Sequence, residues 1–217
     1  MGALPRKSSP QVTVKGNLVI SIQQNYFLTE PQNMQERVYA LFGVFGPLLV
    51  YVSIFWSLLL SPWFNWENNM LSDLGHAGTS NAAPLFNLGL FLAGFLMMVY
   101  ALTIFRKHAK YSSYCLLVST FFVQLLAAFN EAYGSLHYVV AVPHFVMLSL
   151  TSIVYTVEKR SAVALVTFSI SMFSWLLYTL NIFNIGIAVP ETVSKLVVAW
   201  IMYSAIRIFL DKESNTR

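Results

Sequence analysis

The amino-acid sequence predicts an all-α, polytopic integral membrane protein, a bundle of six transmembrane helices with both termini in the cytoplasm. Composition is the first observation behind this prediction. Of the 217 residues, 57% are hydrophobic and only 10% are charged, and the mean hydropathy is +0.62. A soluble domain carries about 25% charged residues. So few charges cannot cover a water-exposed surface, and lipid is the remaining solvent for this much apolar side chain.

Six apolar runs are the second observation. Each is close to the roughly 20 residues that cross a hydrocarbon core of about 30 Å as a helix. Lipid offers no hydrogen-bond partner to the backbone, so spans of this length must be helical. The runs are Tyr39–Ser61, Leu85–Phe105, Ser112–Asn130, His137–Thr156, Ser161–Phe183 and Glu191–Leu210.

The third observation is that lysine and arginine gather in every second connection and at the two termini, and therefore on one side of the predicted membrane. They occur in the N-terminal tail and its junction, in the second and fourth connections, and at the C-terminal end: Arg6, Lys7, Lys15, Arg37, Arg106, Lys107, Lys110, Lys159, Arg160, Arg207, Lys212 and Arg217. Asn65–Pro84, Glu131–Leu136 and Asn184–Pro190 contain neither residue. The positive-inside rule therefore predicts that both termini lie in the cytoplasm. The expected location of the protein is the cell membrane. Positive charge placed this way indicates orientation and argues against a nucleic-acid partner, despite the formal charge of +4.

The predicted organisation is a polar cytoplasmic tail (1–35), a six-helix transmembrane domain (36–211) and a second cytoplasmic tail (212–217). The first tail is expected to be flexible, or to be an extension upstream of a functional start at Met34. Within it, Val12–Ile22 alternates weakly and could form a short strand. No apolar segment follows Arg6 and Lys7, as a signal peptide would require. Cys115 is the single cysteine, so an intrachain disulfide is not possible.

The candidate site residues lie at the end of the bundle opposite the positive charges. Asp73 and His76 are three apart, so a helical turn would point both the same way; Ser72 or Asp73 could cap that turn. Glu131 and His137 flank a short connection and can approach each other. The predicted polar site is Ser72, Asp73, His76, Glu131, His137 and His144.

Four ionisable residues are interpreted individually. His144, two turns below His137, is either a buried histidine bonded to a neighbouring helix or a functional group, because ionisable residues within a span are costly. Glu191 and Lys195 are expected to form an i,i+4 pair, or to contact a lipid headgroup. His108 is expected to be solvated beside Arg106 and Lys107.

A metal site is the chemical alternative for the same residues. Asp73, His76, Glu131 and His137 would together suit zinc or another divalent ion. No HExxH or CxxC spacing accompanies them. Ser72 could be a nucleophile or a hydroxyl that orients a substrate.

The stretch Asn69–Gly75 (NMLSDLG) makes the chain resemble the prokaryotic membrane family called domain of unknown function 998. That family has about six spans and an Asn-x-x-Ser-Asp-Leu-Gly loop after the first. Pro84–Gly89 (PLFNLG) suits its usual second-span start, and Glu131 with His137 resembles its Phe-Pro-Glu and histidine pair, with Asn130 in place of the proline. The resemblance covers about Tyr39–Leu210 and implies a six-helix membrane domain without an assigned activity. A looser similarity, in residue types only, is to zinc-dependent membrane hydrolases of the ceramidase and adiponectin-receptor type.

These features predict a non-enzymatic membrane subunit, a lipid-binding protein or a transport-related protein. Its polar cluster would face outward, with membrane lipids and other membrane subunits as partners. The alternative is a metal-assisted intramembrane lipid hydrolase or transferase that uses Asp73, His76, Glu131 and His137. A proton-coupled carrier that uses Glu131, His137 and His144 is a third hypothesis.

Overall fold

The structure is a computed structural model that describes the backbone of residues 11–182 and 185–214, and side chains from Met34 to Leu210 apart from residues 183 and 184. No strand occurs in the described residues. The elements, in chain order, are α1 (Gln11–Leu59), η1 (Leu71–Gly75), α2 (Ala83–Tyr100), η2 (Ala101–Phe105), α3 (Arg106–His108), α4 (Lys110–Ala128), η3 (Glu131–Tyr133), α5 (Ser135–Lys159), α6 (Ala162–Thr179), α7 (Ala188–Ser194) and α8 (Leu196–Ser214).

Six helical stretches of the described chain are long and apolar enough to cross a membrane, which confirms the predicted six-helix, all-α architecture. Their bounds lie within a few residues of the apolar runs, because the length of a run and the first charged residues beyond it set where a helix leaves the lipid. The stretches are Met34–Leu59, Ala83–His108, Lys110–Ala128, Ser135–Lys159, Ala162–Thr179 and Ala188–Leu210.

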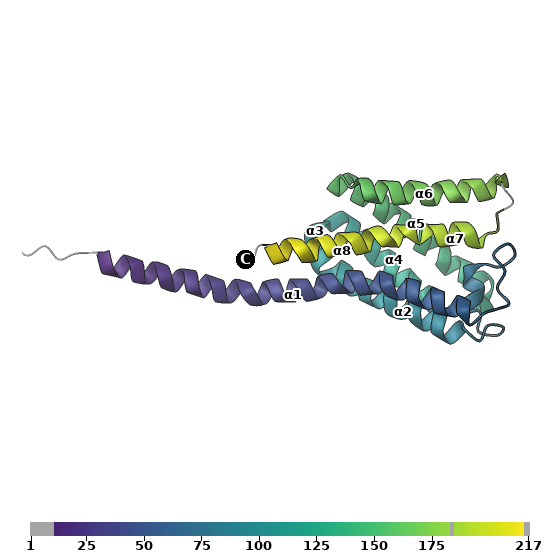
Figure 1. Cartoon of the computed structure of the whole chain (residues 1–217), viewed down its shortest axis with the longest axis horizontal. Helices are drawn as coiled ribbons and strands as arrows, with labels where there is room; N and C mark the ends of the chain where they lie inside the picture. Colours follow the sequence, from purple (N-terminus) through teal and green to yellow (C-terminus); the bar gives the residue numbers. More distant parts are fainter. Residues whose placement is uncertain (1–10, 183–184, 215–217) are drawn as a thin grey trace, which may run out of the picture.

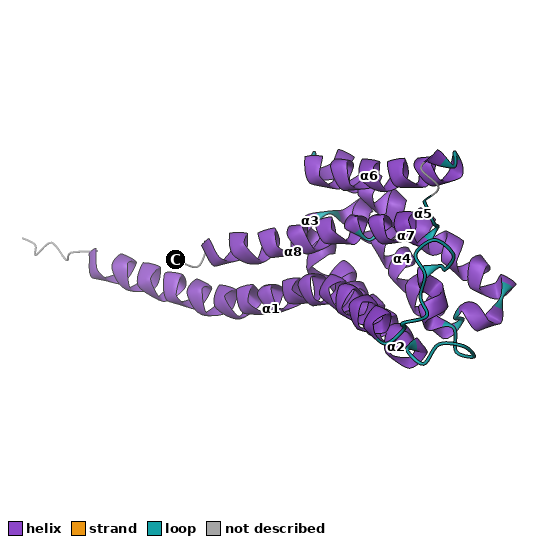
Figure 2. Cartoon of the chain, turned by 45° about the vertical axis from the view of Figure 1, so that its right-hand side comes forward, coloured by secondary structure: helices purple, strands orange, loops and turns teal. Residues whose placement is uncertain are grey.

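The six passes define two ends of the bundle (Figure 1). One end carries the C-terminal part of α8, α3 and the start of α4; we call it the basic end because Arg106, Lys107 and Lys110 lie there. The other, the loop end, carries η1 and η3. Helix α1 packs on α2 and α8, and α4 packs on α2 and α5. Helix α6 lies at the side of the bundle and packs on α5, α7 and α8 (Figure 2).

Small residues allow α1 and α2 to approach closely. A Cβ built on Gly89 would lie 2.6 Å from Ser53 Oγ, and one on Gly46 would lie 2.6 Å from Met97 Cγ. A larger residue at either position would push the two helices apart.

An aromatic stack fills the core toward the basic end. The rings of Tyr155 and Trp200 are stacked with centroids 4.4 Å apart, and Phe105 stacks on Tyr155 at 5.7 Å. The Tyr155 hydroxyl lies 3.4 Å from His108 Nε2. The half-buried His108 therefore contacts the edge of the core, rather than lying in solvent as predicted.

The predicted short strand at Val12–Ile22 is wrong, because helix α1 continues without a break from Gln11 to Leu59. Extending an existing helix adds one hydrogen bond per residue without a new nucleation cost, so a weak alternating pattern next to a span is readily absorbed into that helix. Residues 1–10 of the predicted N-terminal tail and residues 215–217 of the predicted C-terminal tail lie outside the described part of the chain.

The sixth pass is two helices, α7 and α8, that meet at Lys195. Short-range bonds replace the α-helical pattern there: Lys195 N–H donates to Thr192 O, and Val198 N–H donates to Lys195 O. The Tyr51 hydroxyl also donates to Lys195 O at 2.6 Å. A side chain that takes a backbone carbonyl in this way interrupts the helical ladder, and irregular backbone at membrane depth is tolerated where protein surrounds it.

Candidate functional site

The loop between α1 and α2 is held by the predicted Ser-Asp-Leu-Gly turn, η1. Asp73 Oδ2 accepts a hydrogen bond from Met70 N at 3.0 Å and another from Asn69 Nδ2 at 2.9 Å. Leu71 and Leu74 are buried beneath the turn. Asp73 therefore acts as the cap that the sequence predicts, and its side chain stabilises the turn rather than facing a ligand.

Two family motifs interlock where this loop meets α2. Asn87 Nδ2 donates to Gly75 O at 2.8 Å. A Cβ on Gly75 would lie 2.6 Å from Asn87 Oδ1 and 2.8 Å from Phe86 Cδ1. Only glycine leaves room for that approach, so the Asn-x-x-Ser-Asp-Leu-Gly loop and the Pro-Leu-Phe-Asn-Leu-Gly start of α2 form one structural unit.

The same loop is tied to two other parts of the loop end. Leu71 N donates to Glu191 Oε2 of α7 at 2.6 Å. Ala77 N donates to Asn130 Oδ1, which also caps η3 through Ala132 N at 3.1 Å. The first loop is therefore fixed across the end of the bundle.

A cavity of about 200 Å³ lies beneath this loop. It lies among α1, α2, α4, α5, α6 and α7, and much of its wall is apolar, with Phe86, Phe145 and Trp175 among the larger side chains. Ligand sites combine apolar walls with a few converging polar groups in this way. The polar groups lining it are Ser72, Asn87, Asn130, Glu131, His137, Tyr138, Glu191 and Lys195.

Glu131 and His137 form a pair inside the cavity, as the sequence predicts from their short connection. His137 Nε2 lies 3.0 Å from Glu131 Oε2, and the two side chains are only 7% and 10% exposed. His137 Nδ1 lies 2.9 Å from Phe129 O, an acceptor, so Nδ1 carries a hydrogen. Nε2 then faces Glu131 Oε2 at close range, without the alignment of a hydrogen bond.

The carboxylate of Glu131 keeps spare acceptor capacity. Oε1 accepts from the Tyr138 hydroxyl at 3.3 Å. Oε2 is buried, and its close contact with His137 lacks hydrogen-bond geometry, so it has no aligned donor among the described residues. Buried polar atoms are normally satisfied by protein, water or ligand. A donor on a bound molecule would satisfy Oε2.

Glu191 and Lys195 do not form the expected direct i,i+4 ion pair, although their charges attract each other at longer range. Glu191 accepts from Leu71 N instead. The Lys195 ammonium lies 4.9 Å from the centre of the Phe145 ring. A hydrogen bond from a backbone N–H at a turn outweighs a surface-type ion pair, which is worth only a few tenths of a kcal/mol on a helix. Lys195 is the one lysine or arginine among the described residues that line the cavity.

The pattern of the family described as protein of unknown function (DUF998) matches residues 44–207. The chain belongs to the DUF998 family. No curated protein and no solved structure matches it. The match begins within α1, ends within α8, and includes the first loop, the cavity and the Glu131–His137 pair.

In this DUF998 chain the four proposed metal donors are not brought together. Asp73 caps η1, and His76 Nδ1 accepts from Gly78 N at 3.1 Å within the loop itself. Glu131 and His137 pair with each other in the cavity. Among the described residues, no three His, Cys, Asp or Glu side chains are grouped so that they could hold a metal ion. The donor set that suited zinc in the sequence is therefore divided between a loop and a cavity.

His144 lies in the interior, between α4 and α5. Its Nδ1 is 3.0 Å from Ser119 O and 3.1 Å from Ser119 Oγ, and the Ser119 hydroxyl also reaches His144 O. This is the buried histidine bonded to a neighbouring helix that the sequence offers as one alternative. It lines a small cavity of about 50 Å³, which Lys195 and Phe145 also line.

An apolar groove adjoins the polar cavity. It has a volume of about 610 Å³ and is lined by α5, α6 and the region where α7 meets α8. Val142, Phe145 and Trp175 line both the groove and the cavity. Trp175 Nε1 donates to Ser194 Oγ at 2.7 Å at that boundary. Nothing in the sequence singles out Trp175, because a tryptophan within an apolar run has the appearance of any other lipid-facing residue.

Proposed function

We propose that this membrane protein is a non-enzymatic lipid-binding protein of the cell membrane. The headgroup of a phospholipid would occupy the polar cavity, and an acyl chain would occupy the α5–α6 groove. The observation that carries this proposal is that the two spaces adjoin, because Val142, Phe145 and Trp175 line both. An amphiphile needs a polar compartment next to an apolar one.

The charges in the cavity favour a zwitterionic headgroup. The Lys195 ammonium would bind the phosphate, because a lysine binds phosphate as a point charge. The unsatisfied Oε2 of Glu131 would accept from an ammonium group at the other end of the headgroup. A headgroup of the phosphoethanolamine type has both groups. Ser72 and Asn87 also line the cavity and could bind its remaining oxygens.

Exposure of the groove supports entry from the side. Val142 and Val146 of α5 are 59% and 56% exposed, and Met172 of α6 is 41% exposed. Helix α6 is also the least buried of the six spans. A lipid chain could therefore enter between α5 and α6 from the bilayer. The loop end contains no lysine or arginine in its loops, so the positive-inside rule assigns this site to the outer leaflet.

Contact between Trp175 and the bound chain is the experiment that tests the proposal. Phosphatidylethanolamine with a brominated acyl chain should quench the protein's tryptophan fluorescence saturably in phosphatidylcholine nanodiscs, because bromine quenches on contact. Trp175→Phe should remove the saturable component and leave quenching of the other tryptophans. Brominated diacylglycerol, which lacks the phosphate and ammonium, should give no saturable component.

Two results would contradict lipid binding in the groove. One is equal quenching in the wild-type protein and in Trp175→Phe. The other is Trp175 fluorescence that the brominated lipid does not quench. If a second protein covers the groove in that case, a role as a membrane subunit is favoured.

A further inference from the structure

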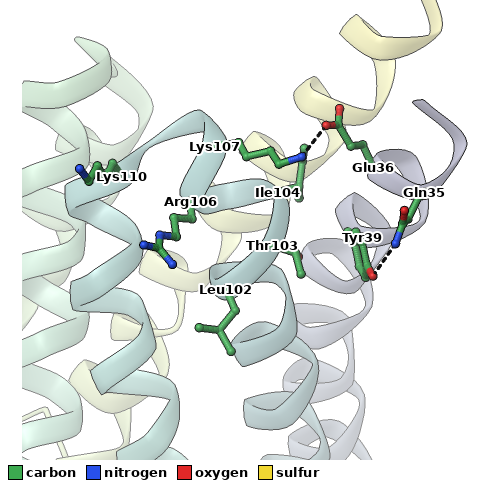
Figure 3. Close-up of a pocket in the computed structure, with 9 residues that line it drawn as sticks. All are labelled: Gln35, Glu36, Tyr39, Leu102, Thr103, Ile104, Arg106, Lys107 and Lys110. Carbon is green, nitrogen blue, oxygen red and sulfur yellow. Dashed lines mark hydrogen bonds and ion pairs between the residues drawn. The ribbon is translucent and has the colours of Figure 1, made fainter. Parts of the chain in front are cut away.

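A separate hollow at the basic end of the bundle is lined by residues of α1, η2 and α3 and by Lys110 of α4 (Figure 3). It has a volume of about 610 Å³. It shares no lining residue with the polar cavity or the α5–α6 groove. Anything that it binds is therefore independent of the phospholipid site proposed at the loop end.

Positive charge lines this hollow. Arg106, Lys107 and Lys110 line it together with a single carboxylate, Glu36, which pairs with Lys107 at 2.9 Å (Figure 3). Lys110 makes no ion pair or side-chain hydrogen bond with the described residues, and its side chain is exposed. The hollow therefore keeps an excess of positive charge after its internal ion pair is counted.

Arg106 is held at the rim by an aromatic ring. Its guanidinium lies 5.5 Å from the centre of the Tyr114 ring, and its Nη2 donates to the Tyr114 hydroxyl at 3.3 Å. Both are contacts of an exposed side chain, which leave the other guanidinium N–H groups for an anion. Arginine held in this way loses less conformational freedom when it binds a phosphate.

The backbone beside the hollow is a single π-helical turn, Ala101–Phe105. Such turns are rare and often occur at functional sites. This one buries Ile104 and Phe105 but leaves Leu102 49% exposed at the wall of the hollow. Tyr39 of α1 completes the wall, and its hydroxyl accepts from Gln35 Nε2 at 3.0 Å (Figure 3). In Figure 3, Arg106, Lys110 and Leu102 point away from α1, whereas Lys107 points toward Glu36 of α1.

We propose that this hollow binds the headgroup of an anionic phospholipid in the leaflet at the basic end, with its chain along Leu102. Basic pockets between transmembrane helices recognise anionic headgroups because they combine surface charge with apolar side chains at the depth of the acyl chains. Arg106 and Lys110 bind the phosphate, and Lys107 stays paired with Glu36. The candidate span Ala83–His108 ends at α3, so Arg106 and Lys110 lie at the end of a membrane-length helix, where lipid headgroups would lie.

Native mass spectrometry of the full chain tests this site. Phosphatidylglycerol and phosphatidylcholine with identical chains are titrated into the wild-type protein and two matched variants. Arg106→Gln/Lys110→Gln should weaken phosphatidylglycerol binding at least fivefold and leave phosphatidylcholine binding unchanged. Lys159→Gln/Arg160→Gln removes the same charge at the same end, outside the hollow, and should change binding less than twofold. Arg106→Lys/Lys110→Arg keeps the charge and should retain phosphatidylglycerol binding. This result would show that the lost affinity of the first variant is not due to misfolding.

Three outcomes would overturn the proposal. Equal losses in the two charge-removing variants would mean that any positive charge at this end suffices. Unchanged binding in Arg106→Gln/Lys110→Gln would place the lipid elsewhere. Full competition by inorganic phosphate would make the ligand a free anion rather than a lipid. Because Lys195 is distant from this hollow, Lys195→Gln should leave phosphatidylglycerol binding here intact, which separates the two sites.

Discussion

Substituting Lys195 by glutamine should weaken the binding of phosphatidylethanolamine about tenfold or more. Lys195 is the only lysine or arginine among the described residues of the polar cavity. A hydrogen bond to a charged group contributes about 1.5–3 kcal/mol, and each 1.4 kcal/mol is roughly a tenfold change in affinity. The saturable quenching of Trp175 by brominated lipid gives the affinity directly.

The same substitution should cost little folding free energy, because the Lys195 ammonium contacts the Phe145 ring and interacts with Glu191 only at longer range than a direct ion pair. Lys195→Arg is the matched control, since it keeps the charge and should bind within a few-fold of the wild-type protein. Unchanged affinity in Lys195→Gln would show that the phosphate does not bind there. An equal loss in both variants would show that the shape of the α7–α8 break, and not its charge, determines binding.

Removing His137 alone should strongly destabilise the loop end. His137→Leu leaves the Glu131 carboxylate, which is 10% exposed, without its partner. Breaking a buried pair on one side costs about 3–5 kcal/mol, because the remaining charge stays buried and uncompensated. The measurement is the free energy of unfolding in mixed detergent micelles.

Neutralising the carboxylate as well should recover much of that loss. The variant Glu131→Gln/His137→Leu has no buried charge at this position, so it should be more stable than His137→Leu by about 1–3 kcal/mol. A double-mutant cycle that also includes Glu131→Gln gives the coupling free energy between the two side chains. Additive effects would mean that the two side chains, although 3.0 Å apart, do not stabilise each other.

Features that depend on local sequence alone were predictable. Six apolar runs gave six spans because the length of an apolar stretch and the thickness of lipid decide where a helix forms. Asp73 capped its turn because an aspartate at that position competes well for backbone N–H groups. Glu131 and His137 met because only a short connection separates them.

Features that depend on packing were not predictable. Glu191 bonds to Leu71, 120 positions away, and that contact replaced the local pair with Lys195. The break at Lys195 follows from Tyr51 of α1, which no pattern within the sixth run could indicate. The helix at Val12–Ile22 depends on its continuity with a span and not on its own alternation. The cavity takes residues from six helices, so its composition appears only once they are assembled.

The measurement that tests lipid binding most directly is photo-crosslinking with a phosphatidylethanolamine that has a diazirine in its acyl chain. Adducts mapped by peptide mass spectrometry should concentrate on Val146, Met172 and Trp175, which line the α5–α6 groove. They should decline with excess unlabelled lipid and in Lys195→Gln. Adducts spread evenly over the lipid-facing sides of all six spans, and unaffected by Lys195→Gln, would contradict a bound lipid in the groove.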